Sequence, residues 1–507
     1  METLTALAQG FVVAFQPYHL WLALIGCLVG TLVGALPGLG PVNGVAILIP
    51  VAFSIGLTPV AAMILLASVY YGTMYGGRIS SIMLNIPGDE PAMMTTLDGY
   101  PMAQSGRAAS ALAISAVASF IGATVATIGL TLFAPLLADV AIHFGPAEYF
   151  ALFVLAFLTI GGITGSNPAK SLLAAAIGLV LGTVGLDPAT GVARYTFGHY
   201  KLYDGIDFMV AIVGLFALSE FLLFLERPPS LTATRVQVGT FKKALTDVAK
   251  TFAAIGRSSV IGFVSGVLPG AGASLGSFLS YVFEKRISDR EGTFGKGDPR
   301  GVAAPEAGNN AAAGGALVPM LTLGIPGSGT TAVLLALLLS LNITPGPLLF
   351  QEQPDLVWGL IAALYLGNVM LLVLNVPLIG LFTRVLMLPY WILMPLVVIV
   401  GFMGVYSINN SAFDLLLMTG FGMFGYVLRK LAISLVPVVL GLLLGSEMEF
   451  SLRRALSISD GDWSILVASP IAVGIYTFAG LLFAVAIGFA VKRAERWWSG
   501  RDASHGG

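Results

Sequence analysis

Hydroxyl side chains that follow two Pro-Gly breaks are the residues best suited to binding chemistry. Ser328, Thr330 and Thr331 open an apolar run, so their hydroxyls and free backbone amides are predicted at a helix N-terminus, where a carboxylate is favoured. Thr95 and Thr96 follow a similar break in the first half of the chain. These residues indicate a site for an organic anion, although plain helix capping would use the same residue types.

Two asparagines and two ionisable residues extend this set. Asn309 and Asn310 could donate to a carboxylate or contact a cation, and they could equally cap a buried helix end. Arg78 and Glu306 stand close to apolar segments, where charged groups are costly. Arg78 could pair with a substrate carboxylate or form a structural ion pair. Glu306 could carry a proton if it lies inside a helical bundle.

Three further carboxylates, Asp89, Glu90 and Asp98, are surrounded by proline and glycine and are expected in a wet loop. Without them, Glu306 is the one acidic residue that could titrate near the predicted anion site. A proton-coupled carrier generally needs a buried titratable group. For a carrier driven by a cation gradient, this sequence would therefore favour Na⁺ over H⁺, with Glu306 as the residue that could reverse the preference.

Catalytic and nucleotide-binding patterns are missing from the sequence. It contains no GxxxxGK[ST] phosphate loop and no HExxH pair. The single cysteine, Cys27, and four scattered histidines give no metal-ligand spacing. A net charge of -1 offers no basic face for nucleic acid. We expect neither an enzyme nor a resident cofactor.

The composition identifies the bilayer as the solvent. The 507 residues are 57% hydrophobic and 10% charged, against roughly 25% charged in a soluble domain, and the mean hydropathy is +0.91. Apolar runs of the length that crosses a bilayer recur along the whole chain. The fold class is therefore predicted to be an all-α polytopic membrane protein with about 12 spans or more. Because the first Lys or Arg is Arg78, no cleavable signal is expected.

Two strings recur in the same order and indicate an internal duplication. Leu36-Pro37-Gly38-Leu39-Gly40 returns as Leu268-Pro269-Gly270-Ala271-Gly272, and Asn85-Ile86-Pro87-Gly88 is echoed by Gly324-Ile325-Pro326-Gly327. We expect an N-terminal repeat over 1–226, with a tip at 36–40 and a broken helix at 85–91. The C-terminal repeat is expected over 258–450, with a tip at 268–272 and a broken helix at 324–331.

The charge pattern predicts that these repeats are inverted. The segment 260–283 lies between two basic stretches, 227–257 and 284–300, and basic loops favour the cytoplasm. A re-entrant helical hairpin turning at Pro269-Gly270 would return the chain to the same side, whereas a kinked single span would not. Residues 1–77 hold no Lys or Arg, so the first hairpin is expected to open outward. Inverted repeats with two hairpins favour an elevator-type transporter.

Two further segments complete the predicted organisation. Residues 227–257 carry apolar residues at helical spacing opposite lysines, which predicts a cytoplasmic amphipathic connector. A soluble loop helix is the alternative. Residues 451–507 are expected to form the last span and a cytoplasmic tail.

Broken helices can bind both a cation and an organic anion, because freed carbonyls suit Na⁺ and helix N-termini suit carboxylates. The residues proposed for the cation lie at the two tips: Pro37, Gly38, Gly40, Pro269, Gly270 and Gly272. The residues proposed for the anion lie around the two breaks: Asn85, Gly88, Thr95, Asn309, Asn310, Gly327, Ser328, Thr330 and Thr331. Glu306 and Arg78 remain candidates for ionisable coupling residues.

Long strings in both halves resemble the large membrane subunit of the tripartite tricarboxylate transporters. In the first half they are Tyr75-Gly76-Gly77, Asn85-Ile86-Pro87-Gly88 and the run Thr95-Thr96-Leu97-Asp98-Gly99-Tyr100-Pro101. In the second half they are Phe294-Gly295-Lys296-Gly297, the two runs 301–307 and 309–315, and Leu323-Gly324-Ile325-Pro326-Gly327-Ser328. Gly308, between the two runs, stands where the family pattern has a bulkier alanine. The likeness extends from about residue 20 to about residue 490.

The resemblance implies a cation-driven symporter for organic anions, usually tri- or dicarboxylates, in the bacterial inner membrane with a cytoplasmic C-terminus. It implies a small membrane subunit and a periplasmic substrate-binding protein as partners, and homodimerisation is a further expectation. Two other interpretations stay open at this point. One is the large subunit of the TRAP-type symporters, which should lack these strings, and the other is a membrane scaffold without transport.

Overall fold

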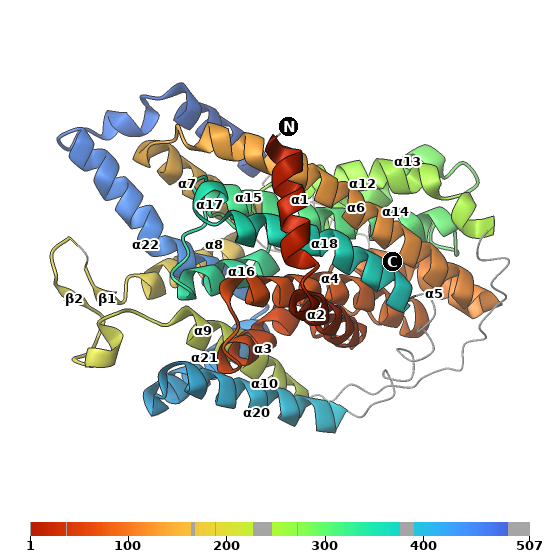
Figure 1. The fold of residues 1–507 in the computed structure, drawn as a ribbon, viewed down its shortest axis with the longest axis horizontal. Coiled ribbons are helices and arrows are strands. Elements are labelled where there is room, and N and C mark those ends of the chain that lie inside the picture. Colours follow the sequence, from red (N-terminus) through yellow and green to blue (C-terminus); the bar gives the residue numbers. More distant parts are fainter. Residues whose placement is uncertain are drawn as a thin grey trace, which may run out of the picture. The chain divides into compact units, whose positions relative to one another are not determined.

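A computed structural model describes residues 2–36, 38–163, 168–187, 189–226, 246–270, 272–375 and 390–484. Over these residues the chain is almost entirely helical (Figure 1). It divides into two compact units, each made of two stretches of sequence. The first unit comprises Met1–Ile142 with Asp207–Val427, and the second comprises His143–Ile206 with Leu428–Gly507.

The helices of the first unit follow the chain as a series interrupted by proline and glycine. They are α1 (Glu2–Ala14), α2 (Pro17–Ala35), α3 (Gly40–Ser54), α4 (Pro59–Leu84), α5 (Met93–Met102), η1 (Ala103–Arg107), α6 (Ala108–Ala141), α9 (Phe208–Ile212), η3 (Val213–Leu218), α10 (Ser219–Glu226), α12 (Phe252–Val267), α13 (Gly272–Ser288), α14 (Pro299–Gly315), α15 (Leu317–Leu323), α16 (Gly329–Ser340), α17 (Leu349–Glu352), α18 (Pro354–Asn375), α20 (Tyr390–Asn409) and α21 (Ala412–Lys430), whose last turn runs beyond the unit.

The second unit contains the helices α7 (Pro146–Ile163), α8 (Pro168–Gly182), η2 (Tyr200–Leu202), α22 (Leu435–Ile458) and η4 (Trp463–Val467), followed by an apolar helix over Pro470–Ala484. Strands β1 (Gly185–Leu186) and β2 (Ala193–Arg194) pair antiparallel, with Gly185 opposite Arg194. Beside this hairpin, Arg453 bridges Asp187 at 3.0 Å and Glu449 at 2.7 Å.

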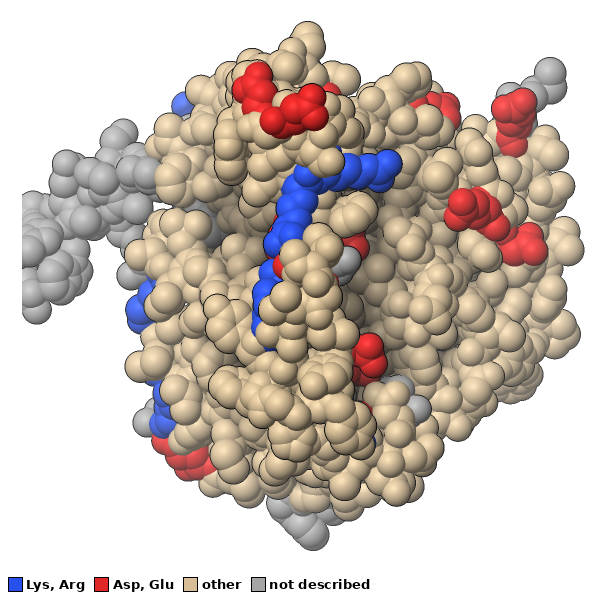
Figure 2. All heavy atoms as spheres, turned by 90° about the vertical axis from the view of Figure 1, so that its left-hand side faces the viewer, with Lys and Arg blue, Asp and Glu red and all other residues tan. Residues whose placement is uncertain are grey.

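The described helices fit a protein that crosses a membrane several times. Seven helical segments are at least 18 residues long and apolar enough to span, and seven shorter apolar helices of 10–17 residues accompany them. Figure 2 shows one face of the molecule, on which charged side chains are sparse. The prediction of a polytopic helical membrane protein is confirmed. The span number of about 12 and the re-entrant hairpins stay predictions.

Two helix pairs in the first unit pack backbone to backbone through glycine. Helix α2 lies along α4, and α12 lies along α14 (Figure 1). A Cβ at Gly34 would overlap the carbonyl oxygen of Thr73, and one at Gly266 would overlap that of Ala312. Two more contacts of this kind recur in both pairs. The contact of Gly30 with Val69 matches that of Gly262 with Gly308, and the contact of Gly76 with Thr31 matches that of Gly315 with Phe263. The α2 and α12 positions are related by the spacing between the two tips, and the α4 and α14 positions by the spacing between the two breaks.

The chain breaks at both predicted tips. Helix α2 ends before Leu36 and α3 begins at Gly40, while α12 ends before Leu268 and α13 begins at Gly272. The turns require positive φ angles, which are +86° and +62° at Gly38 and Gly40 and +74° and +65° at Gly270 and Gly272. Only glycine adopts these angles without strain. Pro37 of the first tip lies outside the described residues.

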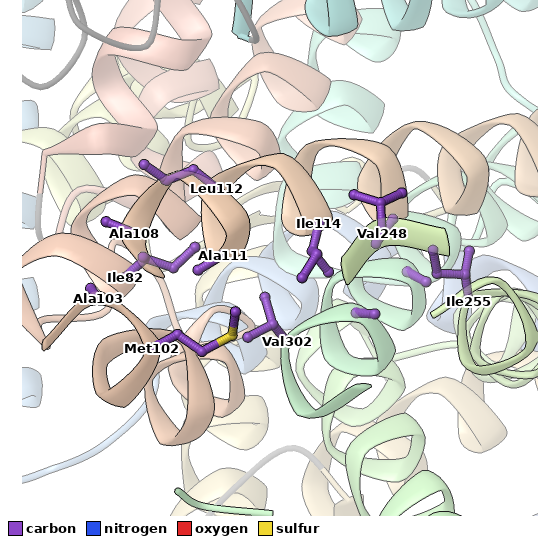
Figure 3. Close-up of a cluster of buried hydrophobic side chains, with 13 residues drawn as sticks. Ile82, Met102, Ala103, Ala108, Ala111, Leu112, Ile114, Val248, Ile255 and Val302 are labelled. Carbon is purple, nitrogen blue, oxygen red and sulfur yellow. The ribbon is translucent and has the colours of Figure 1, made fainter. Parts of the chain in front are cut away.

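A buried apolar cluster joins the two halves of the first unit (Figure 3). It packs the end of α4, helix α5 and the start of α6 against α12 and α14. Its members are Ile82, Met102, Ala103, Ala108, Ala111, Leu112, Ile114, Ala118, Val248, Ile255, Val302, Ala303 and Ala307. The last three belong to the α14 segment that also carries Glu306, so this cluster fixes where that carboxylate stands.

The predicted amphipathic connector, 227–257, is described only from residue 246 onward. Its predicted basic and apolar pattern over 227–245 therefore lies outside the described residues, as does the tail from residue 485. Within the described part, Asp247 forms an ion pair with Arg107 at 3.0 Å.

Candidate functional site

Each tip is tied to the Pro-Gly break of its own half. The amide of Gly38 donates a 3.1 Å hydrogen bond to the carbonyl of Gly88, and the amide of Gly272 donates one of 3.1 Å to the carbonyl of Gly327. Helix α4 is followed by its C-cap Asn85, an exposed residue in the left-handed conformation with φ 58°, and α15 is followed by its C-cap Gly324 with φ +68°. Both breaks therefore bring backbone groups beside their tips.

Gly88 and Gly327 are enclosed by backbone. A Cβ at Gly88 would overlap the carbonyl oxygen of Gly34, and a Cβ at Gly327 would lie 2.9 Å from that of Gly266. Since no side chain fits at either position, glycine is required for packing. Any contact of these two residues with an anion would come from their backbone.

The start of α16 shows the capping arrangement that was one of the two sequence interpretations. Ser328 accepts from the amide of Thr331 at 3.2 Å, and the Thr331 hydroxyl accepts from the amide of Ser328 at 2.8 Å. Thr330 follows Gly329 in the first turn and is buried at 2% exposure. Ser328 and Thr331 thus hold the helix start in place, and their contact with an anion stays a prediction.

The expected wet loop is wrong for Asp89 and Asp98. Asp89 is 9% exposed, and its Oδ1 accepts a 2.9 Å hydrogen bond from the amide of Ala92. A Cβ built at Gly40 of the first tip would lie 3.5 Å from the Asp89 Cβ, and one built at Gly77 of α4 would lie 3.2 Å from Oδ1. Only Glu90 is exposed, as expected. Asp89 is buried because the break packs against the tip and against α4.

Asp98 fastens the start of α14 to α5. Its Oδ1 accepts from the amides of Gly295, Gly297 and Asp298 at 2.8 to 2.9 Å, and its Oδ2 accepts from the Tyr281 hydroxyl at 3.0 Å. The residue is fully buried. Two of the long sequence strings, 95–101 and 294–297, therefore meet at this carboxylate.

The neighbouring carboxyl group of Asp298 belongs to the same loop. Burial opposes its negative charge, but hydrogen bonds from Arg300 and Thr293 outweigh this cost and hold the pKa of Asp298 below its usual value. Arg300 stays beside it at 2.7 Å. The Asp98 clamp and this ion pair are structural, because every partner is a protein group that holds the loop.

Glu306 is fully buried, and its carboxylate accepts hydrogen bonds from two hydroxyls. Its Oε1 accepts a 2.5 Å hydrogen bond from Thr95, and its Oε2 accepts one of 3.0 Å from Ser119. Asn310 donates to Ser119 at 2.9 Å and to the backbone carbonyl of Glu306 at 3.0 Å. The structure thus brings Thr95, Glu306 and Asn310 of the predicted site into one network, whereas the hydroxyl of Thr96 bonds back to the carbonyl of Met93.

Arg78 is fully buried and is held by protein groups. Its Nε donates to the Tyr75 carbonyl at 2.8 Å, and one terminal nitrogen donates to Ser115 at 2.7 Å and to the Leu112 carbonyl at 2.8 Å. The other donates to Asn375 at 3.2 Å. The guanidinium is within electrostatic range of Glu306 but forms no ion pair with it in the described part of the chain. Every nitrogen of the Arg78 side chain thus already donates to the protein.

Asn309 lies one residue from this network without joining it. It is fully buried, and neither atom of its amide has a hydrogen-bond partner among the described residues. Tyr70, at 1% exposure, likewise has a buried polar group without a hydrogen-bond partner among the described residues. Its hydroxyl stands near the Ser328 side chain but does not meet hydrogen-bond geometry. Buried polar groups are rarely left unpaired. Both side chains are therefore candidates for ligand contacts.

Comparison with known proteins identifies the family of the chain. The family model described as "Tripartite tricarboxylate transporter TctA family" matches residues 20–440. The chain belongs to this family. It is also 40% identical over 475 residues, 94% of each chain, to a protein of Agrobacterium vitis named "Uncharacterized 52.8 kDa protein in TAR-I ttuC' 3'region". No solved structure matches the chain.

A second protein of Agrobacterium vitis, "Uncharacterized protein in TAR-II ttuC' 3'region", is 45% identical over 214 residues, which are 42% of this chain and 88% of that protein. Membership of the TctA family makes the chain a component of a membrane transporter and not an enzyme, as the sequence predicted. A tripartite transporter also has partner subunits in general.

The sequence interpretation missed Tyr70 and placed Asp89 in solvent. The internal duplication held a signal for both, because the spacing that relates Gly88 to Gly327 also relates Tyr70 to Asn309 and Asp89 to Ser328. Positions predicted in the second half therefore pointed to partner positions in the first half.

Proposed function

We propose that the chain is the large permease subunit of a binding-protein-dependent secondary transporter that takes up an organic tri- or dicarboxylate by cation symport, with Na⁺ as the favoured cation. Its partners would be a small membrane subunit and a periplasmic substrate-binding protein, and its place would be the bacterial inner membrane. The family match favours this proposal over a TRAP-type subunit or a scaffold.

The observation that carries the proposal is the paired bond between tip and break, Gly38 to Gly88 and Gly272 to Gly327. In each half a glycine turn and an interrupted helix meet, so backbone amides and carbonyls lie outside regular helical hydrogen bonding at the place where a ligand could be bound. The glycine contacts that recur at matched positions of the two halves support two repeats of one design. Inversion of these repeats and elevator motion are part of the proposal.

The ligands are assigned by charge. The tips, with Gly38, Gly40, Gly270 and Gly272, would hold the cation, because backbone carbonyl oxygens suit Na⁺. The anion would face the start of α16, where Thr330 follows the cap, since a helix N-terminus favours a carboxylate.

Deletion and complementation test the function directly. A strain lacking this gene and its two partner genes should lose uptake of one carboxylate from a panel of radiolabelled tri-, di- and monocarboxylates. Restoring all three genes should restore that uptake, and restoring the partners alone should not. Normal uptake of every carboxylate in the deletion strain, together with lost uptake of an unrelated solute, would contradict the assignment.

A further inference from the structure

Asp89 is a buried carboxylate without a positive partner. It forms no ion pair with any described residue, and in the described part of the chain the charged groups that act on it electrostatically are acidic, namely Glu306 and Glu90. Removing an uncompensated carboxylate from water costs several kcal/mol. A mobile positive charge must therefore accompany Asp89 whenever the residue is ionised in this environment.

The carboxyl group also has an oxygen that no protein group uses. Oδ1 accepts from the amide of Ala92, whereas Oδ2 is buried and has no hydrogen-bond partner among the described residues. Two glycines, Gly40 and Gly77, border the Asp89 side chain and put no side chain of their own against it. Oδ2 is thus a free anionic ligand next to the tip that Gly38 ties to the break.

A second oxygen lies in the same region. The unpaired hydroxyl of Tyr70 stands near Ser328 and within electrostatic range of Asp89. The side chain of Ser328 lies beside the second tip, 3.9 Å from the Cβ position of Gly272. The Tyr70 hydroxyl therefore stands in the region of the Asp89 carboxylate and of the capping serine of the second half.

The internal duplication relates these positions in pairs. Asp89 corresponds to Ser328 and Tyr70 to Asn309 at the spacing of the two breaks, while Gly40 corresponds to Gly272 at the spacing of the two tips. Equivalent places in the two halves thus carry a carboxylate in one case and a neutral hydroxyl in the other. Of these two places, only the one in the first half attracts a cation by charge.

We propose that Asp89 is the anionic ligand of the coupling cation, a monovalent ion bound at Oδ2 with the Tyr70 hydroxyl as a further oxygen ligand. This inference rests on the proposed symport function. It assigns the binding of the coupling cation to the carboxylate of Asp89 rather than to that of Glu306. The bound ion removes the cost of burying the Asp89 charge and thereby stabilises the packed arrangement of tip and break.

Thermal unfolding of the full-length protein in lipid nanodiscs tests the site without any carboxylate. The melting temperature is measured in NaCl and in choline chloride at equal ionic strength, at neutral and at acidic pH. A ligand that binds the folded state raises this temperature. We expect Na⁺ to stabilise the wild-type protein, and the shift to disappear in Asp89→Asn, which keeps the acceptor for Ala92 but loses the charge.

Glu90→Gln is the matched control, because it removes the adjacent but exposed carboxylate, and it should keep the wild-type shift. Tyr70→Phe should lower the apparent Na⁺ affinity by about tenfold, as expected for one lost oxygen ligand. If Asp89→Asn does not fold, Asp89→Glu replaces it. The displaced carboxylate should weaken Na⁺ binding, and unchanged affinity would overturn the proposal.

The possible outcomes distinguish Na⁺ from a proton as the bound cation, and they test the cation site independently of the substrate. A shift with acid instead of Na⁺, lost in Asp89→Asn alone, identifies the cation as a proton and keeps the role of Asp89. An equal Na⁺ shift in Asp89→Asn and wild type overturns the proposal, as does the lack of any response to Na⁺ and to pH. Because the assay contains no carboxylate, a wrong substrate class would leave its result unchanged.

Discussion

The Thr95 hydroxyl donates a 2.5 Å hydrogen bond to the buried carboxylate of Glu306. The two residues belong to different halves of the chain, and the bond joins the segment after the first Pro-Gly break to the middle of α14. Hydrogen bonds to charged groups contribute about 1.5–3 kcal/mol. This contact therefore contributes both to the stability of the first unit and to the position of Glu306.

Replacing Thr95 by Val should lower the thermal stability of the protein and reduce uptake of the substrate roughly tenfold, since the Glu306 side chain loses a charge-assisted hydrogen bond of this size. Uptake in cells, normalised to the amount of protein in the membrane, is the measurement. Thr96→Val is the matched control, because the Thr96 hydroxyl bonds to the local carbonyl of Met93. Equal losses in both variants would remove the special role of Thr95.

Asp98→Ala should destabilise the protein by roughly 3 kcal/mol or more, because the three loop amides and the Tyr281 hydroxyl would lose their acceptor at about 1–3 kcal/mol each. Thermal inactivation in detergent reports the loss. Asp98→Asn retains one acceptor oxygen for the amides and should be affected less. An unchanged midpoint in Asp98→Ala would contradict the clamp.

Local chemistry made the helix breaks predictable, whereas contacts between distant parts of the chain could not be predicted. The ends of α2 and α12 follow from proline and positive-φ glycine at the tips, so the strings located the tips at 36–40 and 268–272, where the structure begins new helices at Gly40 and Gly272. The burial of Asp98 depends on amides in the other half of the chain, and no local pattern announces it. For Ser328 and Thr331 the sequence predicted a helix start but could not decide between capping and anion binding, because both require the same residue types.

Small residues on α12 should differ sharply in their tolerance of a methyl group. Gly262→Ala should reduce folded protein in the membrane strongly, because its Cβ would overlap the carbonyl of Gly308. Gly256→Ala on the same helix meets no atom within 4 Å and should be neutral or stabilising by up to about 1 kcal/mol. Fluorescence-detected size-exclusion profiles of both variants are the test. Equal profiles would argue against backbone packing of α12 on α14.

Cysteine labelling tests the proposed hairpin between α12 and α13. In a background where Cys27 is replaced, single cysteines at positions 243 and 296 should both be protected from an impermeant reagent added outside. A re-entrant hairpin returns the chain to the cytoplasm, whereas a single span would place the two positions on opposite sides. Labelling of one position and not the other would contradict the hairpin and would indicate a single span.

Uptake by proteoliposomes that contain this protein with its small membrane subunit and its substrate-binding protein tests the central claim most directly. Under an inward Na⁺ gradient without a pH gradient, the vesicles should accumulate the carboxylate identified by complementation, and replacing Na⁺ by choline should abolish accumulation. Uptake that ignores Na⁺, collapses with a protonophore and fails in Glu306→Gln would contradict Na⁺ symport and would make Glu306 the coupling residue.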